Sequence, residues 1–492
     1  MTGLGELVAR LLLGSDSGAR AAWRKAARTA GLQGVQESRD ELAGFAGRLE
    51  VSLEPFSAPE GRGTRITVRG PTMAAGLTVR PEGVGSAMRL ARGVREVEVG
   101  HDVFDAAAWV EGSPALALAV LDARTRQSLR ALFDGQLERP GHSPFFASGR
   151  LEHGVLRVDV LDAPPRVPRE RRGPGDEPGA FVYLVGPEHL GEALALTIGI
   201  ARRLATPADI PRRLADNLKS EPVAGVRVQV LGTLAREFPD HPATREALLA
   251  ARADPDAEVR LRAGIALGAE GRDVLLALAG GEGAPDDTTQ LAVAALGERL
   301  TTPEAEAILR NALRTRREAT ARASLAVLGQ RRGAQVVSML GKVLAIETPE
   351  LAAAAADALG ATRDAAGEHA LLAALGSPHA GVRVAAARAL GRVGTASAVG
   401  PLREAESGDP GLRRAARQSI AEIQARLAGA GPGQLSLAGA EVGELSIANG
   451  EAGTLSLAEG TAPGPTVVPQ GDEGGQSGRP DRARHGRGAV KG

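Results

Sequence analysis

The chain has 492 residues, of which 43% are apolar but only 2% aromatic, and its 59 basic residues balance its 59 acidic residues. This length predicts two or three domains, and the zero net charge argues against a general electrostatic attraction to nucleic acid or to an anionic membrane. The sequence contains no cysteine, which excludes disulfides, thiolate metal sites and cysteine nucleophiles.

Targeting signals are not evident in the sequence. No apolar run reaches the ~20 residues that span a bilayer, and the N-terminal segment lacks the basic start and the cleavage site of a signal peptide. Apolar residues between Leu4 and Leu12 share one helical face, where Arg10 is the only basic side chain, so peripheral membrane binding stays an alternative. We expect a cytoplasmic protein.

Residues 1–220 mix helical and strand-like patterns, which predicts an α+β domain with a half-solvated antiparallel sheet. Alternating segments rich in β-branched residues predict strands at 49–53, 65–68, 76–79, 94–99, 155–161 and 181–185. Helical spacing of apolar residues predicts helices at 21–29, 115–132 and 188–204. The proline- and charge-rich segment 164–179 is expected to be a loop.

The segment GHDVFDAAAWVEG at 100–112 joins an expected strand to an expected helix. Together with Trp23 and the Gly31-Leu32 pair, it resembles a pattern in uncharacterised bacterial proteins. The resemblance implies a fold and carries no known activity.

A motif that ends in Leu-Gly recurs in the second half of the chain at intervals of roughly 30 residues, which is typical of stacked repeats. Its copies lie at 226–232, 259–268, 291–297, 323–329, 353–360 and 382–391, with a degenerate copy at 412–423. The helical spacing of apolar residues predicts a helix at each copy and a second, shorter helix after it. We predict a right-handed α-solenoid of about six to seven units over residues 222–427.

Local chemistry predicts where these helices begin and end. Asp254, Ser377 and Asp409 each precede a proline, which predicts a helix N-cap followed by proline in the first turn. The glycine after the last leucine of each copy is expected at the helix C-cap, a position that tolerates a positive φ.

The spacing D-P-x-x-x-V-R-x-x-A-x-x-A-L-G is nearly complete at 254–268 and resembles HEAT repeats of the short bacterial type, related to those of phycobilin lyases. The copies within 285–360 lack the Val-Arg pair. The resemblance implies stacked helix pairs that bind other proteins. The composition, rich in alanine, arginine and glycine and poor in lysine, indicates a bacterium with GC-rich DNA.

Residues 433–460 contain three ten-residue repeats, each with a glycine followed by Leu-Ser-Leu/Ile-Ala. The alternation predicts three short β-strands with their apolar residues on one face. Residues 461–492 are rich in glycine, proline and charge and are expected to be disordered.

We find no catalytic constellation, and no cofactor is expected. None of the eight histidines lies three to five residues from another, so no standard metal pair exists. Deoxyhypusine hydroxylase, a HEAT protein, takes its metal ligands from His-Glu dyads, and this chain contains no such dipeptide. His101, Asp102 and Asp105 could form an acid/base cluster, but Asp105 as a helix cap is the simpler interpretation.

The resemblance implies a non-enzymatic protein–protein interaction scaffold that acts through the solenoid. In HEAT arrays the second helix of each repeat usually lines the binding surface. Candidate partner-binding residues here are Arg310, Arg314, Arg316, Arg317, Lys342, His369, Arg403 and Glu404.

Two alternatives stay open. The repeats also fit an accessory or lyase-like enzyme subunit related to phycobilin lyase or deoxyhypusine hydroxylase. A basic patch of Arg314, Arg316, Arg317, Arg331 and Arg332 would suit DNA. However, no aromatic residue follows Phe238, so base stacking is unavailable, and a nucleic-acid partner is not expected.

Overall fold

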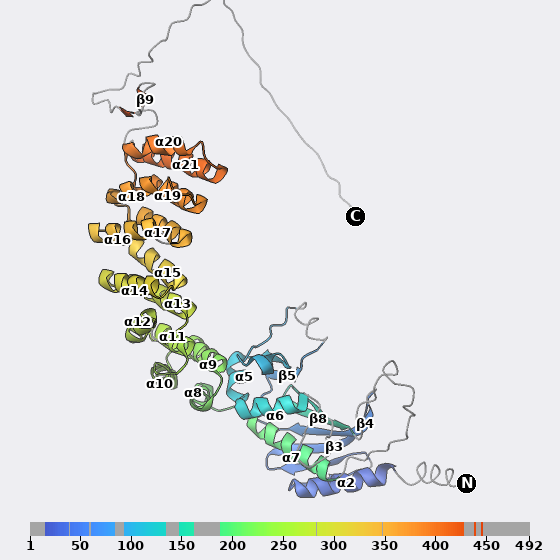
Figure 1. Ribbon diagram of the computed structural model, residues 1–492. Helices are drawn as coiled ribbons and strands as arrows, with labels where there is room; N and C mark the ends of the chain where they lie inside the picture. Colours follow the sequence, from blue (N-terminus) through green and yellow to red (C-terminus); the bar gives the residue numbers. More distant parts are fainter. Residues whose placement is uncertain are drawn as a thin grey trace, which may run out of the picture. The chain divides into compact units, whose positions relative to one another are not determined.

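The computed structural model describes residues 15–38, 40–58, 61–83, 93–133, 147–161, 187–281, 283–346 and 348–427, with two short pieces at 437–438 and 444–445. Residues Met1–Gly429 form one compact unit and Ala430–Gly492 a second. The first unit contains an antiparallel sheet region and a long array of helices (Figure 1).

The described strands of the first unit form one antiparallel sheet in the order β1-β2-β3-β4-β8-β7-β5-β6. Their bounds are β1 (Gln33–Glu37), β2 (Leu42–Ala46), β3 (Leu49–Ala58), β4 (Gly61–Arg69), β5 (Leu77–Pro81), β6 (Ala108–Gly112), β7 (Ala147–Glu152) and β8 (Val155–Leu161). Strand β8 shows the alternation clearly, because Leu156, Val158 and Val160 are fully buried whereas Arg157 and Asp159 lie on the other face.

Helices cover the apolar face of this sheet. Helix α7 (Pro187–Arg203) packs on β3, β4 and β8, and α2 (Ser15–Thr29) packs on α7 and β2. Trp23 of α2 is buried there, and its indole N–H donates to the Thr64 hydroxyl at 2.9 Å. The other helices in the described part of this region are α4 (Asp102–Asp105), α5 (Pro114–Val120) and α6 (Ala123–Phe133).

The sheet region confirms most of the predicted elements. Helices at 21–29 and 188–204 and strands at 49–53, 65–68, 76–79 and 155–161 are present. The predicted strand at 94–99 is wrong, since that segment joins no ladder: the Val97 N–H donates to Val110 O of β6, but no run of such bonds forms among the described residues. The predicted helix at 115–132 is two helices, because Asp122 breaks the run and accepts the Thr125 N–H. The helix at Leu4–Leu12, the loop at 164–179 and the strand at 181–185 lie outside the described residues.

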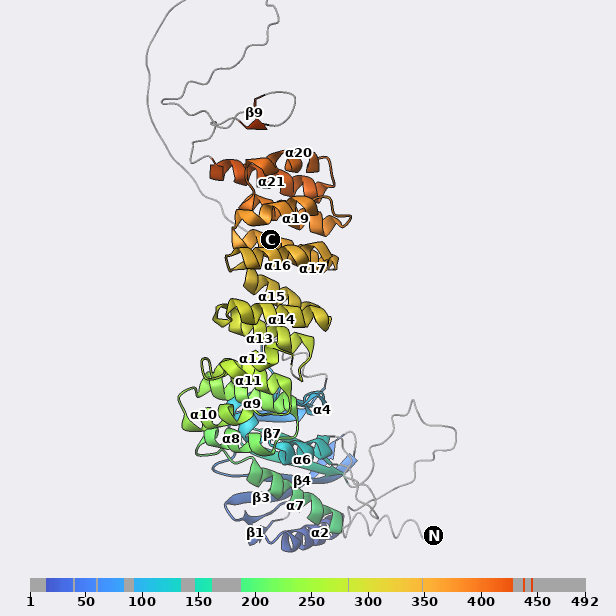
Figure 2. The ribbon, with the colours of Figure 1, turned by 60° about the vertical axis from the view of Figure 1, so that its left-hand side comes forward.

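The helical array confirms the predicted repeat. The copies of the Leu-Gly motif lie on the first helices of the array, and the copies at 259–268 and 291–297 end one or two residues beyond theirs. These helices are α9 (Ala224–Glu237), α11 (Ala257–Ala266), α13 (Asp286–Leu296), α15 (Glu318–Gly329), α17 (Pro349–Thr362), α19 (Ala380–Val393) and α21 (Pro410–Leu427), and no second helix follows α21 in the described residues. The second helices are α10 (Pro242–Ala251), α12 (Arg272–Ala279), α14 (Thr302–Arg314), α16 (Ala334–Ile346), α18 (Glu368–Ala374) and α20 (Val399–Ala405). Consecutive first helices stack on one another, so first and second helices form two layers (Figures 1 and 2).

The predicted N-caps are correct in one case of three. Asp409 accepts the Leu412 N–H at 2.9 Å and caps α21. At α11 the cap is Asp256, while Asp254 accepts two hydrogen bonds from the Arg227 guanidinium of the preceding repeat. At α19 the N-cap is His379, which makes no side-chain cap bond, and the Ser377 hydroxyl accepts the His379 N–H instead.

The glycines after the last leucine differ from the prediction. Only Gly268 and Gly297 have positive φ, at 59° and 45°. Gly232, Gly360 and Gly391 lie inside helices, and Gly329 is the last residue of α15. A Cβ added at Gly360 would lie 2.8 Å from the Cα of Ala389 in the next repeat, so this glycine permits close helix stacking.

The arginines of the Val-Arg pairs form hydrogen bonds to the turn that precedes their own helix. Arg227, Arg260 and Arg383 each donate from Nη1 to the two carbonyls five and six residues before them. Arg227 and Arg383 also donate from Nη2 to Asp254 and Asp409 of the following repeat. These bonds explain why the motif pairs arginine with an Asp-Pro turn.

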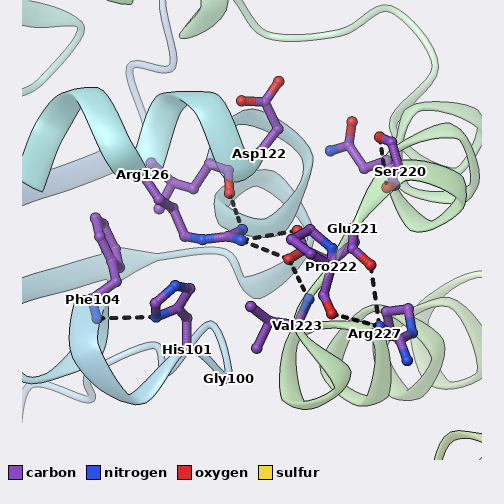
Figure 3. A network of polar contacts seen from close by, with 12 residues as sticks. Gly100, His101, Phe104, Asp122, Arg126, Ser220, Glu221, Pro222, Val223 and Arg227 are labelled. Atoms are coloured by element: carbon purple, nitrogen blue, oxygen red, sulfur yellow. Dashed lines mark hydrogen bonds and ion pairs between the residues drawn. The ribbon is translucent and has the colours of Figure 1, made fainter. Parts of the chain in front are cut away.

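A buried polar network joins the sheet region to the array (Figure 3). The Arg126 guanidinium of α6 donates to both carboxylate oxygens of Glu221 at 2.8 and 2.9 Å, and the two side chains are only 4% and 3% exposed. Glu221 follows α8 (Ile210–Ser220), which itself packs on α5, α9 and α10. The boundary predicted between residues 220 and 222 therefore lies within a compact unit, and a division into two domains there stays a prediction.

The second unit contains two short described strands, β9 (Leu437–Ala438) and β10 (Glu444–Leu445), which pair antiparallel. The third predicted strand and residues 461–492 lie outside the described residues. The described part of the chain does not support the predicted three-strand β-repeat.

Candidate functional site

The binding residues predicted from the sequence lie on the second helices and, for Arg316 and Arg317, just after α14. Arg310 and Arg314 lie on α14, Lys342 on α16, His369 on α18, and Arg403 and Glu404 on α20, all exposed. Arg316 lies in the turn after α14 with a φ of 55°, and Arg317 is the N-cap of α15. Arg314 donates to the Asn311 side-chain oxygen at 2.7 Å. Within the described residues, the side chains of the other second-helix candidates make no hydrogen bond or ion pair.

The five arginines proposed for a DNA-binding patch are not all available to a ligand, because two of them bond neighbouring repeats. Arg317 donates to the Thr289 hydroxyl and to Gly281 O of the preceding repeat. Arg331 donates to Glu298 O and Leu300 O. Both guanidinium groups therefore connect neighbouring repeats, and Arg314, Arg316 and Arg332 are the exposed members of the set.

Earlier second helices carry charges that pair with one another. On α10, Arg245 bonds Glu270 at 2.9 Å. On α12, Arg272 bonds Glu304 at 2.7 Å. The hydrogen bond from Arg272, followed by that from the Thr301 N–H, lowers the pKa of Glu304 from 4.5 to about 2. The charges on α10 and α12 are thus paired between repeats, whereas the Arg310, Lys342 and Arg403 side chains make no bond within the described residues.

A groove lies between α14 and α16 and brings two predicted residues, Arg310 and Lys342, together. It encloses about 500 Å³ and is lined by Glu306, Arg310, Leu313, Gln335, Ser338, Met339, Lys342 and Val343. Glu306 is only 3% exposed; its Oε2 accepts the Gln335 Nε2–H at 2.9 Å, and its Oε1 has no hydrogen-bond partner. The groove therefore combines cations, an apolar wall and a buried carboxyl group.

Sequence reasoning missed Glu306, and a signal for it was available. Ala305, Ile308, Leu309 and Ala312 form the buried stripe of α14, and Glu306 lies three residues before Leu309, at the edge of that stripe. A charged residue among buried positions is uncommon, and it is the usual sign of a functional or paired carboxyl group.

The remaining polar clusters have structural roles. The Asp105 carboxylate accepts the backbone N–H groups of Val99, Gly100 and His101, and His101 is the N-cap of α4. Asp105 is therefore not the N-cap of a helix; its carboxylate stabilises the turn that precedes α4. Among the described residues, no group of histidine, aspartate and glutamate side chains is arranged to hold a metal ion, and no helix is both long and apolar enough to cross a bilayer.

A charged cluster also covers part of the sheet. Glu152 lies 3.8–3.9 Å from nitrogens of Arg80, Arg150 and Arg157, and Arg65 forms a bidentate pair with Asp159. Hydrogen bonding to Asp159 raises the pKa of Arg65. The described charges of this face mostly pair with one another.

Comparison with known proteins agrees with the repeat architecture. A family model of HEAT repeats matches residues 337–421. No curated protein matches the chain. A solved structure of human deoxyhypusine hydroxylase in complex with glycerol aligns with 48% of this chain and 91% of its own, at 17% identity and a TM-score of 0.24. The family match shows that residues 337–421, between α16 and α21, are similar to HEAT repeats, and the described helices of this part of the chain form a helical repeat.

Proposed function

We propose that this chain is a non-enzymatic protein-binding scaffold of the bacterial cytoplasm, which binds its partner through the layer of second helices. One observation carries the proposal: the exposed charged side chains of α14, α16, α18 and α20 mostly have no partner within the described chain. Charged groups left free on one layer of a rigid array are available to a partner. HEAT repeats also commonly mediate protein interactions.

Site-specific photo-crosslinking tests this proposal. A photoreactive residue replaces Ser338 on α16 or Arg403 on α20, and the matched control replaces Arg322, which is exposed on the first helix α15. We expect crosslinked protein adducts in cells from the two second-helix positions and not from position 322. Adducts from position 322 alone, or none from any position, would contradict the proposal.

A further inference from the structure

The groove between α14 and α16 has an unusual balance of charge for a surface of this array. Arg310 and Lys342 are exposed at its rim, and neither forms a hydrogen bond or ion pair within the described chain. By contrast, Arg245 and Arg272 on earlier second helices each bond a glutamate. Two unpaired cations beside one groove favour a ligand that carries carboxylates.

The wall and floor of the groove indicate the rest of the ligand. Leu313 and Met339 are half-buried and Val343 is buried, so an apolar side chain of a ligand would remove their remaining surface from water. Methionine adapts to different side chains because it is unbranched. The volume of about 500 Å³ is sufficient for a few side chains of a bound segment.

Glu306 supplies an independent observation. Its Oε1 is buried without a donor, which is an unfavourable state for a carboxyl oxygen. The exposed Gln335 side chain covers the other oxygen and can change rotamer. A backbone N–H of a bound polypeptide provides the missing donor, whereas the phosphate backbone of a nucleic acid provides none.

We propose that this groove binds an acidic, leucine-containing segment of a partner protein. Carboxylates of the segment pair with Arg310 and Lys342, an apolar side chain packs on Leu313 and Met339, and a backbone N–H donates to Glu306. Nucleic acid fits less well, because its phosphate backbone has no N–H to donate to Glu306 and no aromatic residue follows Phe238 in the chain to stack on a base. This inference rests on the proposed scaffold function and specifies which kind of segment the partner presents to the groove.

Fluorescence anisotropy with the full chain tests it. The probe is a fluorescein-labelled dodecapeptide of glutamate with leucine at every third position; the comparison probes carry lysine in place of glutamate, or are a labelled DNA duplex. We expect the acidic peptide to bind, and R310E/K342E to weaken that binding at least about tenfold. R322E, the matched reversal on α15, should bind as the unmodified chain does, and the lysine peptide should not bind.

Three results would overturn the proposal: no binding of the acidic peptide, equal binding by R310E/K342E, or tighter binding of the DNA. Both substituted side chains are exposed, so far-UV circular dichroism should show an unchanged fold. The photo-crosslinking experiment does not depend on the charge of the ligand. A failure of the peptide to bind, alongside adducts from position 338, therefore rejects the groove chemistry and leaves the scaffold function supported.

Discussion

Glu304 illustrates how one side chain joins two repeats. It accepts hydrogen bonds from Arg272 of the preceding repeat and from the N–H and hydroxyl of Thr301. These bonds favour the charged form of Glu304 and lower its pKa from 4.5 to about 2. The stability that this carboxylate contributes is complete above pH 4.5 and is lost as the pH falls toward 2.

Replacing Arg272 with Met removes the largest cause of this pKa shift. R272M should be less stable than the unmodified chain at pH 7, and it should lose less stability between pH 5 and pH 3. Urea-unfolding midpoints across this range measure the difference. R299M is the control, because within the described residues Arg299 donates to the carbonyls of Gly268 and Ala295 and to no carboxylate, so it should not change the slope. Parallel pH profiles for R272M and the unmodified chain would refute this account.

At the scale of elements, the close stacking of the first helices depends on where glycine lies. Gly232 and Gly360 occupy the same position of the motif, each directly after a leucine and each inside a helix. A Cβ at Gly232 meets nothing within 4 Å, whereas a Cβ at Gly360 would lie 2.8 Å from the Cα of Ala389 and 2.9 Å from its Cβ. The two glycines therefore have different physical roles.

This difference predicts opposite effects for the same substitution. G360A should destabilise the chain by about 1–3 kcal/mol, because α17 and α19 must move apart. G232A should stabilise it by up to about 1 kcal/mol, because alanine favours the helix and fills empty space. Free energies of unfolding from denaturant titration decide the question, and effects of the same sign at both positions would be inconsistent with the stacking described.

At the scale of the whole first unit, the buried Arg126–Glu221 pair joins the sheet region to the array. Each partner is almost fully buried, so removing one leaves the other charge without compensation. Gly100 has a φ of 83° and lies next to Gly225 of α9. A Cβ added at Gly100 would lie 2.5 Å from the Gly225 carbonyl oxygen. Both features require the two regions to meet closely.

Replacing Glu221 with Ala should destabilise the first unit by about 3–5 kcal/mol. The control is E246A, since the Glu246–Arg212 pair is exposed and contributes at most about 1 kcal/mol. Differential scanning calorimetry measures both variants. A loss in E221A no larger than that in E246A would show that the network does not hold the two regions together.

Much of this architecture follows from local patterns in the sequence. The spacing of the Leu-Gly copies placed the first helices, and period-two alternation placed several strands, because burial of one face imposes these periods along the chain. The expected position of the second helices also selected Arg310 and Lys342, which line one groove, while their binding role stays a prediction. Such features depend on neighbours within a few residues.

Only the tertiary structure decided the rest. The sheet order places β8 between β4 and β7, and such pairings join residues far apart in the sequence. Asp254 resembles an N-cap locally but bonds Arg227, 27 residues away, and Gly360 resembles a C-cap but lies against the next repeat. Glu306 is likewise buried, and its hydrogen-bond donor is Gln335 of the following repeat, 29 residues away. These roles depend on contacts between repeats, which a short-range pattern does not specify.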